Sequence, residues 1–453
     1  MAESGHPWRG RIPRVREPPD VRARNGDTTT DPVLPRRPPR LRFPEPLLSC
    51  RTRNSRKRCS ALSGFPKEGI VKETLPSRSP GETDGPPTTS GGTPPATGQT
   101  RAAPAPADAR TRSAKPRDAL FDNAKYLAIV LVAVGHAWEP LRSESRTVTA
   151  LYTLVYAFHM PVFIVISGYF SRGFDWSAGR IKRLVTGVAV PYVVFEVAYT
   201  FFTRWSDNKP DRSISLLDPL YLTWFLAALF IWRLTTPIWR SVRWPLPLAL
   251  TIAALATLAP SIGKDLDLHR TLQFLPYFVL GLSLKPEHFE KVRRRQVRIL
   301  AAPVFLGALV MAYWAVTRMN YAWFFHNSSA EDLAAPAWYG PLMTLAIFGC
   351  STVLVACFLA LVPRRRTWYT ALGAGTLYGY LLHGFVIQGA NHWHWSRNDW
   401  FHRPLGGITV TVVAAVVVTV LCTAPVRRVF RAVLEPRMDW AFRQREPAPP
   451  KSG

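Results

Sequence analysis

Residues 405–426 read LGGITVTVVAAVVVTVLCTAPV, and no charged side chain interrupts this run. A helix needs about 20 mostly apolar residues to cross the hydrocarbon core of a bilayer. The stretch therefore predicts a membrane-spanning helix. It also excludes an ordinary soluble enzyme and a small disulfide-stapled secreted domain.

Nine further apolar stretches predict helices of the same kind, and the chain is expected to be an all-α polytopic membrane protein with about ten transmembrane helices. These stretches are 120–138, 151–170, 181–202, 220–238, 245–262, 272–284, 299–317, 342–362 and 372–389.

The first 117 residues have a different composition from the rest of the 453-residue chain. They hold 20 of the 41 prolines and 23 of the 57 Lys and Arg, against 11 of the 30 Asp and Glu. Such a segment cannot bury enough apolar surface to offset the entropy of ordering it. We expect a disordered basic Pro/Arg-rich tail over 1–117, a membrane domain over 118–430 and a C-terminal tail over 431–453. The residues leave open whether the first tail is functional or a misassigned start of the reading frame.

The net charge is +27, and outside the first tail the basic residues gather in every second predicted loop. Cytoplasmic loops of membrane proteins are rich in Lys and Arg, and every second predicted loop is basic here, whereas the loops between them are near neutral. Both termini are therefore expected in the cytoplasm, with the chain in the cell membrane. No nucleic-acid motif accompanies the charge, so no nucleic-acid partner is expected. The basic loops hold Arg172, Arg180, Lys182, Arg183, Arg240, Arg243, Lys285, Lys291, Arg293–Arg295, Arg298 and Arg364–Arg366.

The first predicted span carries a polar stripe. Lys125 and His136 lie 11 residues apart, about 20° from a whole number of helical turns, so both occupy one helix face, about 16 Å apart along the axis. Asp122 lies one turn below Lys125. A phosphate-bearing cofactor head at Lys125, Asp122 and the nearby Arg183 is expected to send a thioester arm toward His136. The alternative is that Lys125 reaches the lipid headgroups and His136 bonds a neighbouring helix.

Other ionisable residues within predicted spans are candidate site residues, because burying them in a membrane is costly. His159 in the second span and His383 in the ninth are expected to share a site with His136. The alternative for His159 is a packed donor to a neighbouring helix. Glu196 in the third span is expected either to orient a histidine or to pair with Lys or Arg.

Metal binding is not expected. The five cysteines show no metal-ligand spacing. The histidines His392, His394 and His402 form a candidate cluster, but the tryptophans among them favour an interfacial aromatic belt or a sugar-stacking surface.

These residues resemble the acyltransferase-3 family of integral membrane acyltransferases, in particular its fucose O-acetyltransferase-like branch. Many members have arginine where this chain has Lys125. Lysine keeps the positive charge but cannot form the two parallel hydrogen bonds that a guanidinium group makes with phosphate. The matching segments are Asp122–Lys125–His136, Phe158-His159-Met160-Pro161, Ser167-Gly168-Tyr169, Thr223-Trp224-Phe225-Leu226, Phe274–Gly281, Leu372-Gly373 and Thr376–His383.

The resemblance implies ten helices and the transfer of an acyl group, usually acetyl from acetyl-CoA, to a hydroxyl of a glycan. It also implies that His136 is the essential histidine. We expect His136 to act as general base, since its ordinary pKa near 6.5 suits proton transfer near neutral pH. His159 or His383 is expected to orient the acceptor or to stabilise the oxyanion. A covalent acyl-histidine intermediate stays open. The expected partners are the lipid bilayer, acyl-CoA as a donor substrate without a tightly bound cofactor, and a sugar or glycan acceptor.

Two other functions compete with this one. A transporter would use the same polar stripe as a proton or solute path, although the chain lacks the matched pair of broken helices that secondary transporters often show. A non-catalytic scaffold would use its basic tail to bind nucleic acid or anionic lipid.

Overall fold

The computed structural model describes residues 118–442 except 209, 263–264 and 437. The predicted tail 1–117 and most of the predicted C-terminal tail lie outside the described residues. The described part is all-helical, with no strand among its elements. The predicted fold class, an all-α polytopic membrane protein, is confirmed.

The α-helices keep the order of the predicted spans. They are α1 (Ala119–Trp138), α2 (Arg146–Ser171), α3 (Ala178–Leu184), α4 (Val190–Ser206), α5 (Trp224–Leu234), α6 (Thr236–Ser241), α7 (Pro245–Ala256), α8 (Leu268–Gln273), α9 (Leu275–Ser283), α10 (Pro286–Val292), α11 (Arg295–Ala315), α12 (Tyr339–Leu361), α13 (Thr376–His392), α14 (Pro404–Leu421) and α15 (Ala424–Leu434).

Short 3-10 and π-helical turns connect or extend these helices. They are η1 (Glu139–Glu144), the π-helical η2 (Val185–Ala189), η3 (Pro260–Ile262), η4 (Asp265–Asp267), η5 (Tyr321–Phe325), η6 (Thr370–Gly375), η7 (Trp395–Arg397), η8 (Asp399–His402) and η9 (Asp439–Ala441).

Within the described residues, six helical stretches are long and apolar enough to cross a membrane, and α5 and α7 are shorter apolar helices. The predicted span 272–284 is broken into α8 and α9, and the predicted span 405–426 divides at Cys422 into α14 and the basic helix α15. The predicted domain boundary at residue 430 falls inside α15. A count of ten spans stays a prediction. The six stretches are Ala119–Glu144, Arg146–Ser171, Ala178–Ser206, Arg295–Ala315, Tyr339–Leu361 and Pro404–Leu421.

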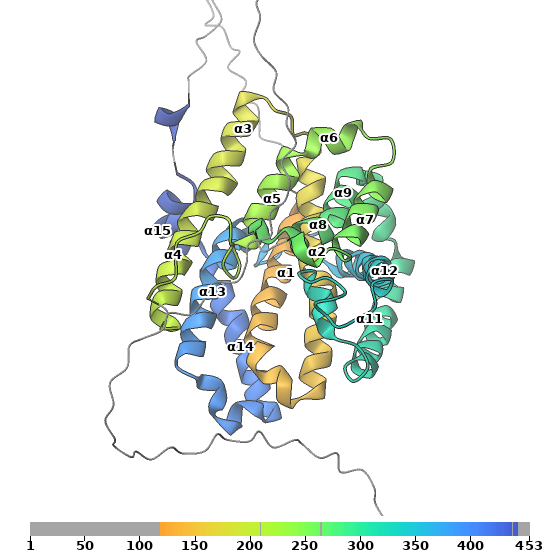
Figure 1. Ribbon diagram of the computed structural model, residues 1–453, viewed down its shortest axis with the longest axis vertical. Coiled ribbons are helices and arrows are strands. Elements are labelled where there is room, and N and C mark those ends of the chain that lie inside the picture. Colours follow the sequence, from red (N-terminus) through yellow and green to blue (C-terminus); the bar gives the residue numbers. More distant parts are fainter. Residues whose placement is uncertain (1–117, 209, 263–264, 437, 443–453) are drawn as a thin grey trace, which may run out of the picture. The chain divides into compact units, whose positions relative to one another are not determined.

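Helices α1 and α2 lie at the centre of the bundle, between α13 and α14 on one side and α11 and α12 on the other (Figure 1). The carboxylate of Asp118 accepts a hydrogen bond from the Leu120 amide and caps the start of α1, which satisfies one of the free donors of the first turn. The Ser145 hydroxyl accepts from the Val148 amide in the same way at the start of α2. The first cap fixes where α1 begins, and the second fixes where the chain turns back alongside α1 as α2.

Helices α2 and α9 cross with their backbones in close approach. A Cβ added at Gly168 would collide with the Phe278 carbonyl oxygen, and one added at Gly281 would collide with the Val165 carbonyl oxygen. Only glycine permits backbones to approach this closely. The crossing holds α9 against the C-terminal part of α2, beyond the segment that carries His159.

Candidate active site

A cavity of about 220 Å³, here called the histidine cavity, lies where α1, α2, α5, α8 and α13 meet. Its wall combines ionisable side chains with a dense set of aromatic rings. Its lining residues are His136, Glu139, Tyr152, Tyr156, His159, Met160, Tyr221, Leu222, Trp224, Arg270, Phe274, Phe324, Phe325 and Tyr380.

His136 faces a carboxylate that directly follows α1. Its Nδ1 atom lies 3.9 Å from Glu139 Oε2 and 3.5 Å from the Tyr156 hydroxyl. Both separations exceed an ordinary hydrogen bond, as is common for catalytic contacts before substrate binds. Glu139 reaches this position because η1 continues the helical path, which places it on the same side three residues later. A carboxylate beside Nδ1 favours the tautomer that leaves Nε2 free to accept a proton.

His159 lines the same cavity, but its Nδ1 atom is already bonded. Nδ1 of His159 lies 2.8 Å from the Val155 carbonyl oxygen, and Nδ1 of His383 lies 2.9 Å from the Gly379 carbonyl oxygen. A carbonyl only accepts hydrogen bonds, so each Nδ1 carries the proton and donates it. Each ring is thereby held by its own helix with Nε2 as an acceptor.

His383 is close to His136 but does not line the histidine cavity. The two ring centroids are 5.7 Å apart, but His383 lines a separate apolar cavity of about 220 Å³ between α1, α13 and α14. Its Nε2 atom is buried and has no hydrogen-bond partner among the described residues. The structure thus brings His136 and His159 into one cavity and places His383 next to His136 on the other side.

Tyrosines that the sequence analysis did not single out complete the histidine cavity. The Tyr221 ring lies 5.3 Å from the His136 ring between centroids, and its buried hydroxyl has no partner in the part of the chain that the structure describes. Tyr221 adopts a positive φ of 54°, which is costly for a bulky residue. The Tyr380 hydroxyl donates to the Leu222 carbonyl oxygen at 2.7 Å and fixes the neighbouring backbone. Tyr221 is therefore a buried donor held beside the imidazole.

The predicted cation on α1 is paired within its own helix. Lys125 Nζ lies 2.8 Å from Asp122 Oδ1, three residues earlier. Next to them Asn123 is buried and donates to the carbonyl oxygens of Pro363 and Arg365. These bonds tie the start of α1 to the segment that follows α12. We call this end of the bundle, where α1 begins and α2 and α12 end, the basic end.

A second polar cavity, of about 390 Å³, lies at the basic end near the end of α2 and the start of α3. Its lining includes three arginines, Arg180, Arg183 and Arg233, and we call it the arginine cavity. The Arg233 Nε atom is buried without a hydrogen-bond partner among the described residues. An arginine with an unused buried donor beside two further guanidinium groups is suited to binding phosphate oxygens. From the sequence, Arg180 was named only as a basic loop residue, and Arg233 was not named as a candidate.

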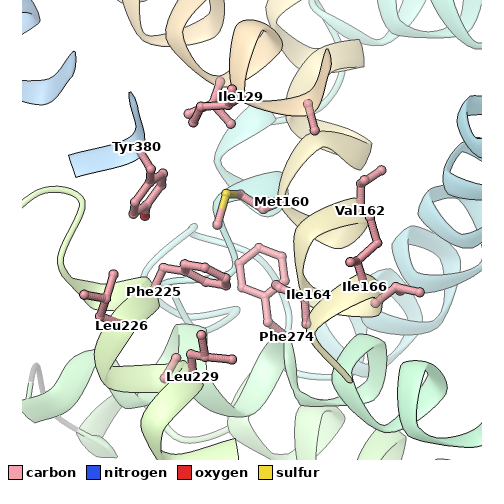
Figure 2. Close-up of a cluster of buried hydrophobic side chains, with 14 of the residues drawn as sticks. Ile129, Met160, Val162, Ile164, Ile166, Phe225, Leu226, Leu229, Phe274 and Tyr380 are labelled. Carbon is pink, nitrogen blue, oxygen red and sulfur yellow. The ribbon is translucent and has the colours of Figure 1, made fainter. Parts of the chain in front are cut away.

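Packed apolar side chains separate the two cavities. Figure 2 shows Met160, Phe225 and Phe274 gathered between α2 and α5, with Leu229 beyond them. Trp224 at the start of α5 lines the histidine cavity, and Arg233 near its end lines the arginine cavity. Nine residues of helix separate them, or about 13.5 Å along the axis. The two cavities thus lie near opposite ends of α5.

Two other sequence-based candidates have structural roles. The Glu196 carboxylate accepts hydrogen bonds from the Leu220 amide and the Thr223 hydroxyl. It fixes the turn before α5, and among the described residues neither predicted partner, a histidine or a cation, is bonded to it. In the histidine-rich segment, His392 Nδ1 donates to the Ser206 carbonyl and His402 Nδ1 lies 2.9 Å from Glu144. Within the described ranges no three His, Cys, Asp or Glu residues are placed to share a metal ion.

Comparisons with known proteins identify the family of the chain. The acyltransferase-3 family profile, described as "Acyltransferase domain", matches residues 118–427. Nodulation protein NolL of Mesorhizobium japonicum is 37% identical over 333 residues, covering 66% of this chain and 86% of that protein. Nodulation protein NolL of Sinorhizobium fredii is 24% identical over 299 residues, covering 61% of this chain and 79% of that protein. No solved structure matches the chain significantly. The chain belongs to the acyltransferase-3 family and is a multi-pass membrane acyltransferase.

Proposed function

We propose that the enzyme transfers an acyl group, acetyl in the simplest case, from acyl-CoA to a hydroxyl of a sugar or glycan, with His136 as general base. The observation that carries this proposal is the position of His136 in a buried aromatic cavity with Nδ1 turned toward Glu139. An imidazole oriented by a carboxylate is the usual arrangement for taking a proton from a hydroxyl.

The donor is proposed to enter from the basic end. Its phosphates contact Arg180, Arg183 and Arg233, and Lys125 adds a further cation nearby. The extended arm follows α5 past the apolar layer and presents the thioester in the histidine cavity. Met160 in this layer is unbranched and adapts its shape readily. We propose from the positive-inside rule that the basic end faces the cytoplasm, with both termini on that side, and that the enzyme lies in the cell membrane.

The reaction forms an ester and releases a thiol. His136 Nε2 takes the proton of the acceptor hydroxyl while its oxygen attacks the thioester carbonyl carbon. The Tyr221 hydroxyl, which has no partner in the described residues, donates to the developing oxyanion. The carbon–sulfur bond then breaks, and the proton passes from His136 to the departing sulfur. Glu139 stabilises the imidazolium while it carries this proton.

The test uses acetyl-CoA labelled in its acetyl group and membrane vesicles whose cytoplasmic face points outward. Vesicles with and without the enzyme are compared in a strain that lacks the gene. The proposal requires enzyme-dependent label in a sugar-containing fraction, released by mild alkali as acetate, and identifies the labelled sugar. A transporter would instead accumulate solute without ester formation. Label confined to protein or phospholipid, or no label above the control, would contradict the proposal.

A further inference from the structure

An open polar cavity of about 510 Å³, here called the outer cavity, lies on the side of the histidine cavity away from the basic end. Its polar lining consists of Asp218, Asp267, His269, Asn327, Ser328 and Asp332.

The same three chain segments line both cavities. Asp218 precedes Tyr221 before α5, Asp267 precedes Arg270 at α8, and Phe325 precedes Asn327 after η5. At the boundary, Arg270 Nη1 lies 2.7 Å from Asp267 Oδ2. Arg270 faces the histidine cavity and Asp267 faces the outer cavity. A molecule that reacts in the first cavity therefore has the second one as the adjoining space for the rest of its structure.

Two lining groups of the outer cavity have unused hydrogen-bonding capacity. His269 is only 7% exposed, and its Nδ1 atom is buried with no partner among the described residues. The Asp218 carboxylate makes no hydrogen bond or ion pair in the described part of the chain. The other two carboxylates are occupied, since Asp267 pairs with Arg270 and Asp332 accepts from Ser329. A buried polar atom without a partner is costly unless a ligand or water satisfies it.

The chemistry of this lining selects among ligands. Three carboxylates disfavour an anionic group, and no metal-binding trio of side chains is present among the described residues. Carboxylate and amide oxygens together with an imidazole suit hydroxyl and amine donors, and the ring faces of Pro219 and Pro260 supply apolar contact. Neutral and amino sugars offer both hydroxyl or amine donors and apolar ring faces. A uronic acid adds a carboxylate that the three aspartates repel.

We propose that the outer cavity is an acceptor subsite that binds a second, neutral or amino, sugar residue next to the residue being acylated. This inference rests on the proposed function, since it presupposes a sugar acceptor. The enzyme then recognises at least a disaccharide unit and discriminates against acidic neighbours through Asp218.

The test uses four acceptors built on the sugar that the labelling experiment identifies. They are its methyl glycoside and its disaccharides with glucose, glucosamine or glucuronic acid. We expect the wild type to prefer the glucose and glucosamine disaccharides over the glucuronic acid one by about tenfold in kcat/KM, the effect of one charge-assisted contact. Asp218→Asn lowers this preference several-fold through KM. Asp211→Asn, an exposed carboxylate outside this lining, leaves it unchanged.

The outcomes separate the two proposals. If the labelling experiment finds no sugar, the proposed function fails and the subsite fails with it. If the wild type uses all four acceptors equally, or Asp218→Asn keeps the full preference, only the subsite is overturned. Asp218 is exposed and its carboxylate makes no hydrogen bond or ion pair in the described residues, so its substitution tests recognition and not folding.

Discussion

Replacing Glu139 by glutamine removes the charge beside His136 while keeping the size of the side chain. At the observed 3.9 Å the interaction between Glu139 and an imidazolium at His136 is about 1 kcal/mol in water and about 4 kcal/mol at the effective dielectric near a protein surface. The Glu139 side chain is 43% exposed, so an intermediate value of about 2 kcal/mol is appropriate. The imidazolium forms only as the hydroxyl proton is transferred, so the loss falls on the transition state.

This loss corresponds to a decrease in kcat of about 30-fold for Glu139→Gln, with KM for acetyl-CoA little changed. The assay is initial-rate transfer of labelled acetyl from acetyl-CoA to the identified acceptor, with membranes matched for enzyme content. Glu144→Gln is the matched control, because Glu144 is a more exposed carboxylate at the same end of the bundle that contacts His402 and not His136. A Glu139→Gln rate equal to that of the Glu144→Gln control would refute the role assigned to the carboxylate.

Three other predictions concern separate parts of the structure. Arg233→Met is expected to raise KM for acetyl-CoA about 30-fold with kcat little changed, because charged hydrogen bonds to phosphate are worth about 2 kcal/mol; unchanged steady-state kinetics would contradict the arginine cavity as the donor site. Gly168→Ala is expected to destabilise the protein by about 2 kcal/mol through collision with backbone, whereas Gly307→Ala, with nothing within 4 Å of the added Cβ, is tolerated; thermal unfolding in detergent compares them. Hydrogen bonds from Ser329 lower the pKa of Asp332 below 3.8, so the Asp332 carboxylate stabilises the fold above that pH and loses this effect as the pH falls through its lowered pKa. Asp332→Asn therefore lowers the melting temperature at pH 7, and the difference from the wild type shrinks only below about pH 4. A difference in melting temperature that stays constant from pH 7 to below about pH 4 would contradict this role of Asp332.

The sequence was sufficient for the features that depend on composition and helical spacing. The uninterrupted apolar run at 405–426 predicted a membrane helix, and the 11-residue spacing of Lys125 and His136 placed both on α1. Glu139 was missed because the predicted span ended at residue 138, yet its spacing of three residues from His136 was a usable signal. Arg233 carried a signal too, since it is a cation inside the predicted span 220–238.

Other features depend on tertiary structure and leave no local signal. The positive φ of Tyr221 and the turn that Glu196 fixes arise from contacts between distant segments. The position of His383 behind His136 depends on how α13 is rotated against α1, which its own sequence does not determine. The outer cavity likewise forms only where three loops meet.

The central claim, that His136 is the base for acyl transfer, is tested most directly by the kcat of His136→Asn with labelled acetyl-CoA and the identified acceptor, at matched enzyme content and thermal stability. The account predicts a fall of about 10²–10⁴-fold, the usual contribution of a positioned general base. A His136→Asn enzyme that forms the ester at the wild-type rate would contradict it.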